Sequence, residues 1–305
     1  GWLLTPSAWM TPPTTCGKRS RISWSYANRA MAQVSQTVDA PVPVRMDLDT
    51  ELNGCRIHHM MTSEAVGPAI RATELVKAFG ENRAVDGISF DLEPGRIYGV
   101  LGPNGSGKTT LIRLLTGLAK ATSGEAEVLG VPMPSRENLA HIGYMTQSDG
   151  VYPTLSVFDN ARFFAAAYGV RDKESIMEAL SVVELADRAK EATMNLSGGQ
   201  RRRLSLACAL IHKPAVLFLD EPTVGVDPLL RVQFWGHFRA LADAGTTIVV
   251  SSHVMDEADR CDELLFMRSG AVIARGTGVE LRQRAGTDDL EQAFLSFAGD
   301  VEVTK

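Results

Sequence analysis

The segment Gly102–Thr110, with the sequence GPNGSGKTT, constrains the fold of this chain more than any other. It lies between an apolar run at residues 97–101 and an apolar-periodic run at residues 111–115, an order that predicts strand, glycine-rich loop and helix. It fits the pattern G-x-x-x-x-G-K-[ST], whose fixed positions are Gly102, Gly107, Lys108 and Thr109. The spacing predicts a loop that binds the phosphates of a nucleotide.

The chemistry of this loop follows from its residue types. Glycine adopts positive φ without a steric penalty, so successive N–H groups of the loop can converge on one anion. The helix that starts near Gly107 adds unpaired N–H groups and the positive end of its dipole. We expect Lys108 to reach the β- and γ-phosphates and the Thr109 hydroxyl to bind Mg²⁺. The predicted ATP-binding residues of the loop are Gly102, Pro103, Asn104, Gly105, Ser106, Gly107, Lys108, Thr109 and Thr110.

A second motif follows four consecutive large apolar residues at 216–219, which predict a strand buried on both faces of a parallel sheet. Asp220 and Glu221 come directly after this strand, at the sheet edge where α/β proteins bind ligands. One carboxylate there can hold Mg²⁺ and the other can polarise an attacking water. The alternative is a solvated turn at Asp-Glu-Pro, and the presence of the phosphate loop favours the catalytic interpretation.

Three further residues end predicted strands. His253 follows a buried strand over 246–252 and leaves the same sheet edge, so a contact to a γ-phosphate is predicted. Gln147 follows a strand over 142–145. Phe79 ends a strand over 69–79, where its ring could stack on a base, although the pattern alone favours a core side chain. A helix is predicted over 201–212, directly after the sequence SGGQ. The pattern also predicts a short strand over 126–131, a short acidic helix over 255–263, and a hairpin over 264–274 that turns at Ser269-Gly270.

These motifs agree in order and spacing, and residues 69–297 resemble the ATP-binding subunits of ABC transporters. The most specific motif is Leu196–Gln200 (LSGGQ), the family signature, which other phosphate-loop proteins lack. The resemblance implies an α/β fold of the P-loop NTPase (RecA-like) type, with a parallel core sheet, an antiparallel β-subdomain and an inserted helical subdomain at about residues 148–200. The ATP-binding domain would span residues 69–305.

The resemblance also implies roles for matching positions. Asp220 would be the Walker B ligand of Mg²⁺, and Glu221 the general base that orients water. Gln147 would sense Mg²⁺ and relay to the membrane partner, and His253 would contact the γ-phosphate. Phe79 matches the aromatic residue that stacks on adenine, which replaces the core interpretation. The implied catalytic residues are Glu221, His253, Gln147 and Lys108, and the implied metal ligands are Thr109, Gln147 and Asp220.

The family pairs two subunits head to tail, so that each ATP lies between the Walker A loop of one and the signature of the other. The signature residues implied to contact ATP are Ser197, Gly199 and Gln200, and Asp227 would contact the other subunit. The implied cofactors are ATP and Mg²⁺. The implied partners are a second copy or a paralogue and a separate integral-membrane subunit, which would hold this chain at the cytoplasmic face of the membrane.

A narrower likeness concerns the loop Glu221–Pro228 (EPTVGVDP), which departs from the commoner Ser-Ala-Leu-Asp form. It resembles the ABC-2 branch, which includes antibiotic and multidrug exporters, as do the segments at 84–90 and 289–295. The likeness indicates export without naming a cargo.

An alternative function is that of a soluble ABC ATPase that acts on ribosomes or nucleic acid. Such proteins usually carry two ATP-binding domains or a long coiled-coil insertion, and this chain has neither. A nucleotide-gated scaffold is a third possibility, disfavoured by the intact catalytic residues.

The composition of the chain limits the kinds of partner that we expect it to bind. The formal net charge of −5 over 305 residues gives no electrostatic reason to expect nucleic acid. No run approaches the roughly 18 apolar residues that a membrane helix needs, so we expect any membrane role to come through a partner. Residues 1–68 carry scattered Pro, Ser and Thr without periodicity and are predicted to be a disordered extension. A transit peptide, an upstream start site and an added leader are alternative interpretations, with Met60 or Met61 as natural starts.

Overall fold

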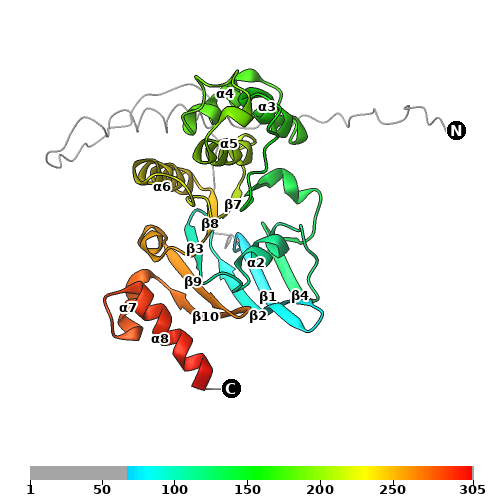
Figure 1. Cartoon of the computed structure of the whole chain (residues 1–305). Coiled ribbons are helices and arrows are strands. Elements are labelled where there is room, and N and C mark those ends of the chain that lie inside the picture. Colours follow the sequence, from blue (N-terminus) through cyan, green and yellow to red (C-terminus); the bar gives the residue numbers. More distant parts are fainter. Residues whose placement is uncertain (1–66, 304–305) are drawn as a thin grey trace, which may run out of the picture. The chain divides into compact units, whose positions relative to one another are not determined.

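The computed structural model describes residues 67–303, so the predicted N-terminal extension (1–68) lies outside the described residues except for its last two. The described part of the chain contains two β-sheets (Figure 1). The smaller has the order β2-β1-β4-β5 and is antiparallel. Its strands are β1 (Ile70–Phe79), β2 (Asn82–Leu92), β4 (Ser123–Val128) and β5 (Val131–Pro132).

The larger sheet has the order β10-β9-β3-β8-β7-β6 and is parallel except for β10. Its strands are β3 (Ile97–Leu101), β6 (Ile142–Met145), β7 (Val216–Asp220), β8 (Thr247–Ser252), β9 (Glu263–Arg268) and β10 (Ala271–Gly276). The predicted architecture, a parallel core sheet with an antiparallel β-subdomain, is confirmed. All residues of β3, β7 and β8 are buried, as the continuous apolar runs indicate.

Both faces of the core sheet are covered. On β9, Leu265 and Met267 join the core shared with α2 (Lys108–Leu115) and the antiparallel sheet. The intervening Leu264 and Phe266 join a second core with α7 (Gly278–Ala285) and α8 (Leu290–Val303). This alternation follows from the two-residue period of a strand.

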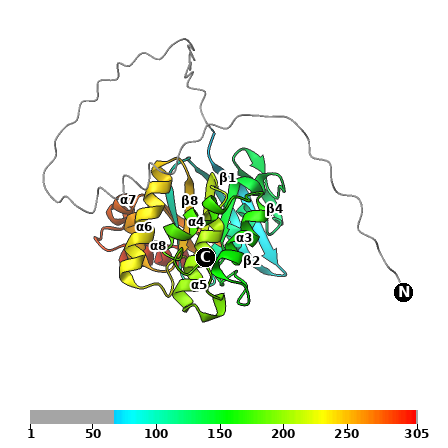
Figure 2. The same cartoon turned by 90° about the horizontal axis from the view of Figure 1, so that it is seen from above.

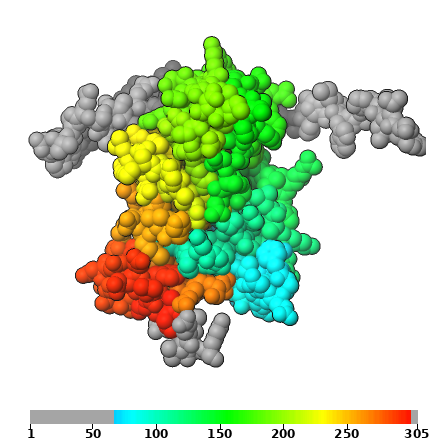
Figure 3. Space-filling view, in the orientation of Figure 1, coloured from blue at the N-terminus to red at the C-terminus, as the bar shows by residue number. Residues whose placement is uncertain are grey.

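Three helices form a separate group: α3 (Val157–Ala167), α4 (Lys173–Val182) and α5 (Gly198–Leu210). They pack on one another, and α5 also contacts β6. In Figure 1 this group lies at the opposite end of the described part from α7 and α8, and the space-filling view shows the same separation (Figure 3). The helix α6 (Pro228–Asp243) runs along the side away from β1 and β4 (Figure 2).

Several predicted boundaries were wrong. The strand predicted over 126–131 begins at Ser123, because pairing with β1 extends its ladder into a turn-like sequence, and it ends at Val128. The short acidic helix predicted over 255–263 is a 3₁₀-helix, Met255–Arg260, because β9 begins at Glu263. The patterns also missed α6 and α7. The Asp227 side chain caps α6, because its Oδ1 accepts a hydrogen bond from Leu230 N at 3.0 Å. The next residue is a proline, which is common at the first position of a helix.

One buried hydroxyl stabilises the turn that leads into β3, the strand before the phosphate loop. Tyr98 is fully buried, and its hydroxyl accepts a hydrogen bond from Glu93 N at 2.7 Å and donates to Glu93 O at 3.1 Å. We expect Tyr98→Phe to lower the free energy of unfolding by about 1–3 kcal/mol, because both backbone groups lose their partner. Urea denaturation measures the change. The matched variant Tyr152→Phe removes the hydroxyl of a half-exposed tyrosine and should change stability by less than about 0.5 kcal/mol.

Candidate nucleotide-binding and hydrolysis site

The parallel register of the core sheet brings the predicted site residues to one edge. Asp220 at the end of β7 lies opposite Ser251 of β8, and Leu101 at the end of β3 lies opposite Ser252. The loops that follow these strands therefore start side by side at the carboxyl edge, where ligands bind in open α/β sheets.

The phosphate loop is packed too closely for side chains at two of its glycines. A Cβ at Gly107 would lie 2.2 Å from Ala84 O, and one at Gly102 would lie 2.2 Å from Met267 O. Gly107 also has a φ of +105°, in the left-handed region. The backbone of Ser106 accepts a hydrogen bond from Gly270 N at 3.0 Å, which ties the loop to the β9–β10 turn. The cradle is thus fixed by the surrounding strands.

Lys108 is buried at the first position of α2, and its Nζ donates to Gly102 O at 2.7 Å and to Pro103 O at 3.0 Å. Burial lowers the pKa of this ammonium group, while the nearby Glu221 and Asp220 carboxylates raise it. Thr109 and Thr110 are half-buried in the same turn, and Asn104 is exposed at the tip of the loop. A cation therefore lies within a glycine loop at a helix N-terminus, which suits a polyphosphate.

Asp220 is fully buried, and its Oδ1 accepts a hydrogen bond from Ser251 Oγ at 2.5 Å. Its Oδ2 is buried and has no hydrogen-bond partner among the described residues. An unpaired carboxylate oxygen is costly in such a place unless it has a cationic ligand. Together with the hydroxyl of Thr109, this donor set of hard oxygens fits Mg²⁺.

Glu221 lies between two side chains from separate loops. Its Oε2 accepts a hydrogen bond from Gln147 Nε2 at 3.2 Å, and its Oε1 lies 3.2 Å from His253 Nδ1. The backbone of Glu221 has a φ of +52°, a strained value for a residue with a side chain. Its N–H donates to both the carbonyl and the hydroxyl oxygen of Ser251 at 3.1 Å. The structure thus brings together Gln147, Glu221 and His253, which are far apart in the sequence.

Phe79 and Asp227 lie outside this cluster of contacts. The Phe79 side chain is 58% exposed at the end of β1, with Lys77 Nζ 5.1 Å from the ring centroid. An exposed ring at a strand end suits stacking on a base, and its exposure excludes the core interpretation. Asp227 is exposed at the N-cap of α6.

The signature forms the first turn of α5, which begins at Gly198 and not at Arg201 as predicted. The cause is a capping box, in which Gln200 N donates to Ser197 Oγ at 3.2 Å and Ser197 N donates to Gln200 Oε1 at 2.8 Å. No hydrogen bond of the described residues joins the signature to the phosphate loop of the same chain. Ser197 is exposed, so the helix N-terminus is open to an anion from outside the chain.

The sequence analysis missed two buried charged residues beside the site. Arg202 of α5 is buried and donates to backbone carbonyls at Gln147 and Glu221. Glu257 is buried too, and it accepts hydrogen bonds from Thr223 Oγ1 at 2.5 Å and from Ser252 Oγ at 2.9 Å. Within the run Arg201–Arg203 no sequence pattern separates the buried arginine from its neighbours. A glutamate in an acidic stretch likewise looks solvated.

The fold and this edge define a P-loop nucleotide-binding protein. The ABC transporter family matches residues 85–224. The chain is 42% identical over 241 residues to the probable multidrug ABC transporter ATP-binding protein YbhF of Escherichia coli, across 76% of this chain and 42% of that protein. It therefore spans less than half the length of that relative.

Two other proteins share more of their length with this chain. The Nod factor export ATP-binding protein I of Rhizobium etli is 36% identical over 253 residues, which are 77% of this chain and 80% of that protein. A solved structure of MJ0796, described as a dimeric bacterial ABC transporter cassette, superposes with a TM-score of 0.64 at 25% identity, over 68% of this chain and 98% of that chain. This chain belongs to the ABC transporter family, as one of its ATP-binding proteins, and the family resemblance is confirmed.

The close approach at Gly107 leads to a prediction. We expect Gly107→Ala to abolish measurable ATP binding, because the new methyl group would clash with the backbone of Ala84 and displace the loop. Binding of a fluorescent ATP analogue measures the loss. Gly169→Ala is the matched control, since Gly169 also has a positive φ (+76°) but would meet no atom within 4 Å. Full affinity in Gly107→Ala would contradict the assigned geometry.

Proposed function

We propose that this chain binds and hydrolyses ATP with Mg²⁺, dimerises head to tail on ATP, and powers export through a separate membrane subunit. The observation that carries the proposal is the position of Glu221. Its carboxylate lies next to the Mg²⁺-compatible Asp220 and between Gln147 and His253, at the edge that also holds Lys108.

Each residue of the site would have a separate role in ATP hydrolysis. Lys108 and the loop N–H groups would hold the β- and γ-phosphates, and Thr109, Asp220 and Gln147 would hold Mg²⁺, which neutralises phosphate charge. Glu221 would accept a proton from the attacking water, since its carboxylate is already oriented by Gln147. His253 is partly exposed, so its ring can turn from Glu221 towards a γ-phosphate. Phe79 would stack on adenine.

The dimer follows from the incomplete site. Ser197, Gly199 and Gln200 would bind ATP held by the other subunit, because in their own chain they are not joined to the phosphate loop. The similar cassette MJ0796 is dimeric, which supports the pairing of two ATP-binding subunits. Exposed apolar residues near Asp227, namely Val224, Leu229 and Val232, would be covered by the second subunit. The second subunit is either another copy or a paralogue.

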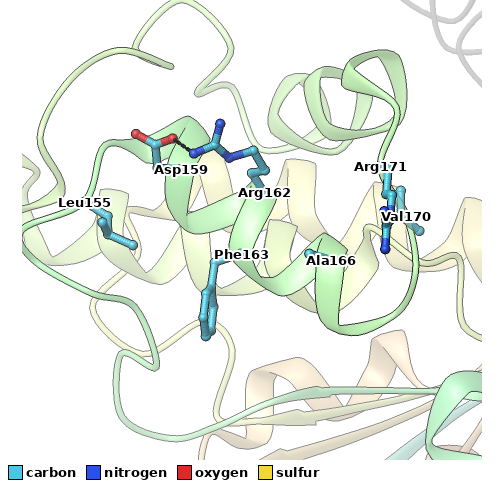
Figure 4. A pocket seen from close by; sticks show the side chains of 7 residues that line it. All are labelled: Leu155, Asp159, Arg162, Phe163, Ala166, Val170 and Arg171. Atoms are coloured by element: carbon cyan, nitrogen blue, oxygen red, sulfur yellow. Dashed lines mark ion pairs between the residues drawn. The ribbon is translucent and has the colours of Figure 1, made fainter. Parts of the chain in front are cut away.

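A hollow on the helical group suits the membrane partner. Its volume is about 650 Å³, and it is lined by Leu155, Asp159, Arg162, Phe163, Ala166, Val170 and Arg171 (Figure 4). Figure 4 shows Phe163 pointing away from the Asp159–Arg162 ion pair. Phe163 is half exposed and meets Tyr152 edge to face, with ring centroids 5.1 Å apart. A half-exposed aromatic ring with charged side chains in the same hollow suits a short amphipathic helix of the partner.

This hollow is connected to the hydrolysis site. Asn160 of α3 is fully buried; its Oδ1 accepts from Tyr152 N at 2.7 Å and its Nδ2 donates to Tyr152 O at 2.9 Å. The segment that leaves Gln147 is thereby fixed to α3. A partner helix docked on α3 would move together with Gln147, which supports transmission of the ATP cycle to the membrane subunit.

The partner would also supply the membrane location. Between residues 67 and 303, none of the helices has the length and apolar character required to cross a bilayer. Membership of the ABC transporter family supports the proposal that the membrane partner holds the chain at the cytoplasmic face of the membrane. The names of the relatives, which refer to multidrug transport and Nod factor export, support the export branch without identifying a cargo.

Hydrolysis and dimerisation can be separated by one substitution. We expect Glu221→Gln to bind ATP with affinity near that of the unmodified chain and to accumulate as a closed dimer, because only the proton acceptor is lost. Size-exclusion chromatography with and without ATP measures the dimer. Lys108→Ala is the comparison, and it should lose both ATP affinity and the dimer. A Glu221→Gln protein that stays monomeric with ATP bound would contradict the head-to-tail arrangement.

The membrane partner is tested by gentle solubilisation of membranes and affinity purification of the tagged chain. We expect a stoichiometric protein with several membrane helices. Phe163→Glu should release that protein and leave the ATP-dependent dimer intact, whereas Val279→Glu, at an exposed valine of α7, should release nothing. Co-purification of ribosomes or nucleic acid without a membrane protein would favour the soluble alternative.

A further inference from the structure

Arg202 links two segments of the hydrolysis site from inside the protein. It is 5% exposed on α5; within residues 67–303 its two Nη atoms donate to backbone carbonyls, and its buried Nε has no hydrogen-bond partner. The Nη1 atom donates to Thr146 O at 2.9 Å and to Gln147 O, and Nη2 donates to Asp220 O at 2.8 Å and to Glu221 O at 2.6 Å. One side chain therefore holds the backbone of both the Gln147 loop and the end of β7.

These bonds support a strained backbone. Glu221 has a φ of +52°, and such strain persists only where the surroundings fix the conformation. Its N–H is fixed by Ser251 and its carbonyl oxygen by Arg202. Burial lowers the pKa of Arg202, and the nearby carboxylates Asp149, Asp220 and Glu221 oppose this. A buried cation that makes four bonds through a planar fork is not replaced by lysine, whose three N–H donors all lie on one nitrogen atom.

Arg202 also connects this backbone to the signature. Ser197 caps the same helix five residues earlier, a rise of about 7.5 Å along a rigid helix. Gly199 lies against the loop after β7, since a Cβ there would be 3.4 Å from Gly225 O. A displacement of the helix N-terminus would thus reach the carbonyls of Gln147 and Glu221 through the guanidinium group.

We propose that Arg202 is a positioning residue that couples the signature of α5 to the catalytic backbone of its own chain. The inference rests on the proposed function, in which that signature contacts ATP held by the other subunit. Engagement of ATP by Ser197 would fix α5, and Arg202 would then hold Glu221 and Gln147 in the hydrolytic arrangement. Each site would reach full activity only when the neighbouring site is occupied.

The test compares Arg202→Lys with Arg203→Lys in the full chain. Arg203 is the next residue of the same helix, but it donates to Val183 O at 3.3 Å and pairs with Glu184 at 3.6 Å, away from the site. We expect Arg202→Lys to lower kcat about 10- to 100-fold with KM for ATP within about twofold, because it misplaces Glu221 without touching the phosphate loop. Arg203→Lys should keep both constants.

Hydrogen exchange supplies a readout that does not depend on activity. In Arg202→Lys, amide exchange should accelerate in peptides covering residues 146–149 and 220–223 and stay unchanged elsewhere. Acceleration throughout the chain would show a general loss of stability and overturn the positioning role. Unchanged exchange and an unchanged kcat in Arg202→Lys would overturn it as well.

The coupling itself is tested by a double-mutant cycle with Ser197→Asp, which keeps an N-cap acceptor but repels a phosphate. If Ser197 acts through Arg202, the loss of kcat in the double variant should be clearly smaller than the product of the two single losses. Multiplicative losses would refute the coupling alone. A wild-type chain that shows neither ATP hydrolysis nor an ATP-dependent dimer would instead overturn the proposed function.

Discussion

The site depends on the parallel hydrogen bonding of β3, β8 and β7. Parallel strands end at the same edge of a sheet, so the residues that follow them meet although the chain separates them widely. Because the strands are buried on both faces, their register is fixed by the core. A slip of one residue would move Asp220 away from Ser251 and reverse which side chains face each core.

Charge burial gives this edge its chemistry. The charged groups of Lys108, Asp220 and Arg202 are buried. In the protein interior a charge interacts more strongly with its neighbours than in water, and a missing partner costs more free energy. The two Nη atoms of Arg202 donate to backbone carbonyls, and Lys108 donates to the carbonyls of its own loop. Asp220 keeps one oxygen without a partner among the described residues. That oxygen is the clearest sign of a cation in the working protein.

The sequence predicted more of the site than of the helices around it. The phosphate loop, the strand before Asp220 and the hairpin of β9 and β10 carry local signals, because glycine spacing and buried apolar runs reflect local backbone requirements. The helix α6 was missed although Asp227-Pro228 is a typical start, and the signature was placed before α5 although it forms its first turn. In both cases a side-chain cap decided the boundary, and apolar periodicity does not report caps.

Residue types at short, fixed spacing are enough to predict the phosphate loop, the class of fold and the chemistry proposed for Asp220 and Glu221. The folded chain was needed to show that Glu221 lies between Gln147 and His253, and that Arg202 is the buried member of three adjacent arginines. Such contacts join segments tens of residues apart, and their partners are often backbone atoms. A backbone carbonyl is the same at every position, so no pattern of side chains identifies it in advance.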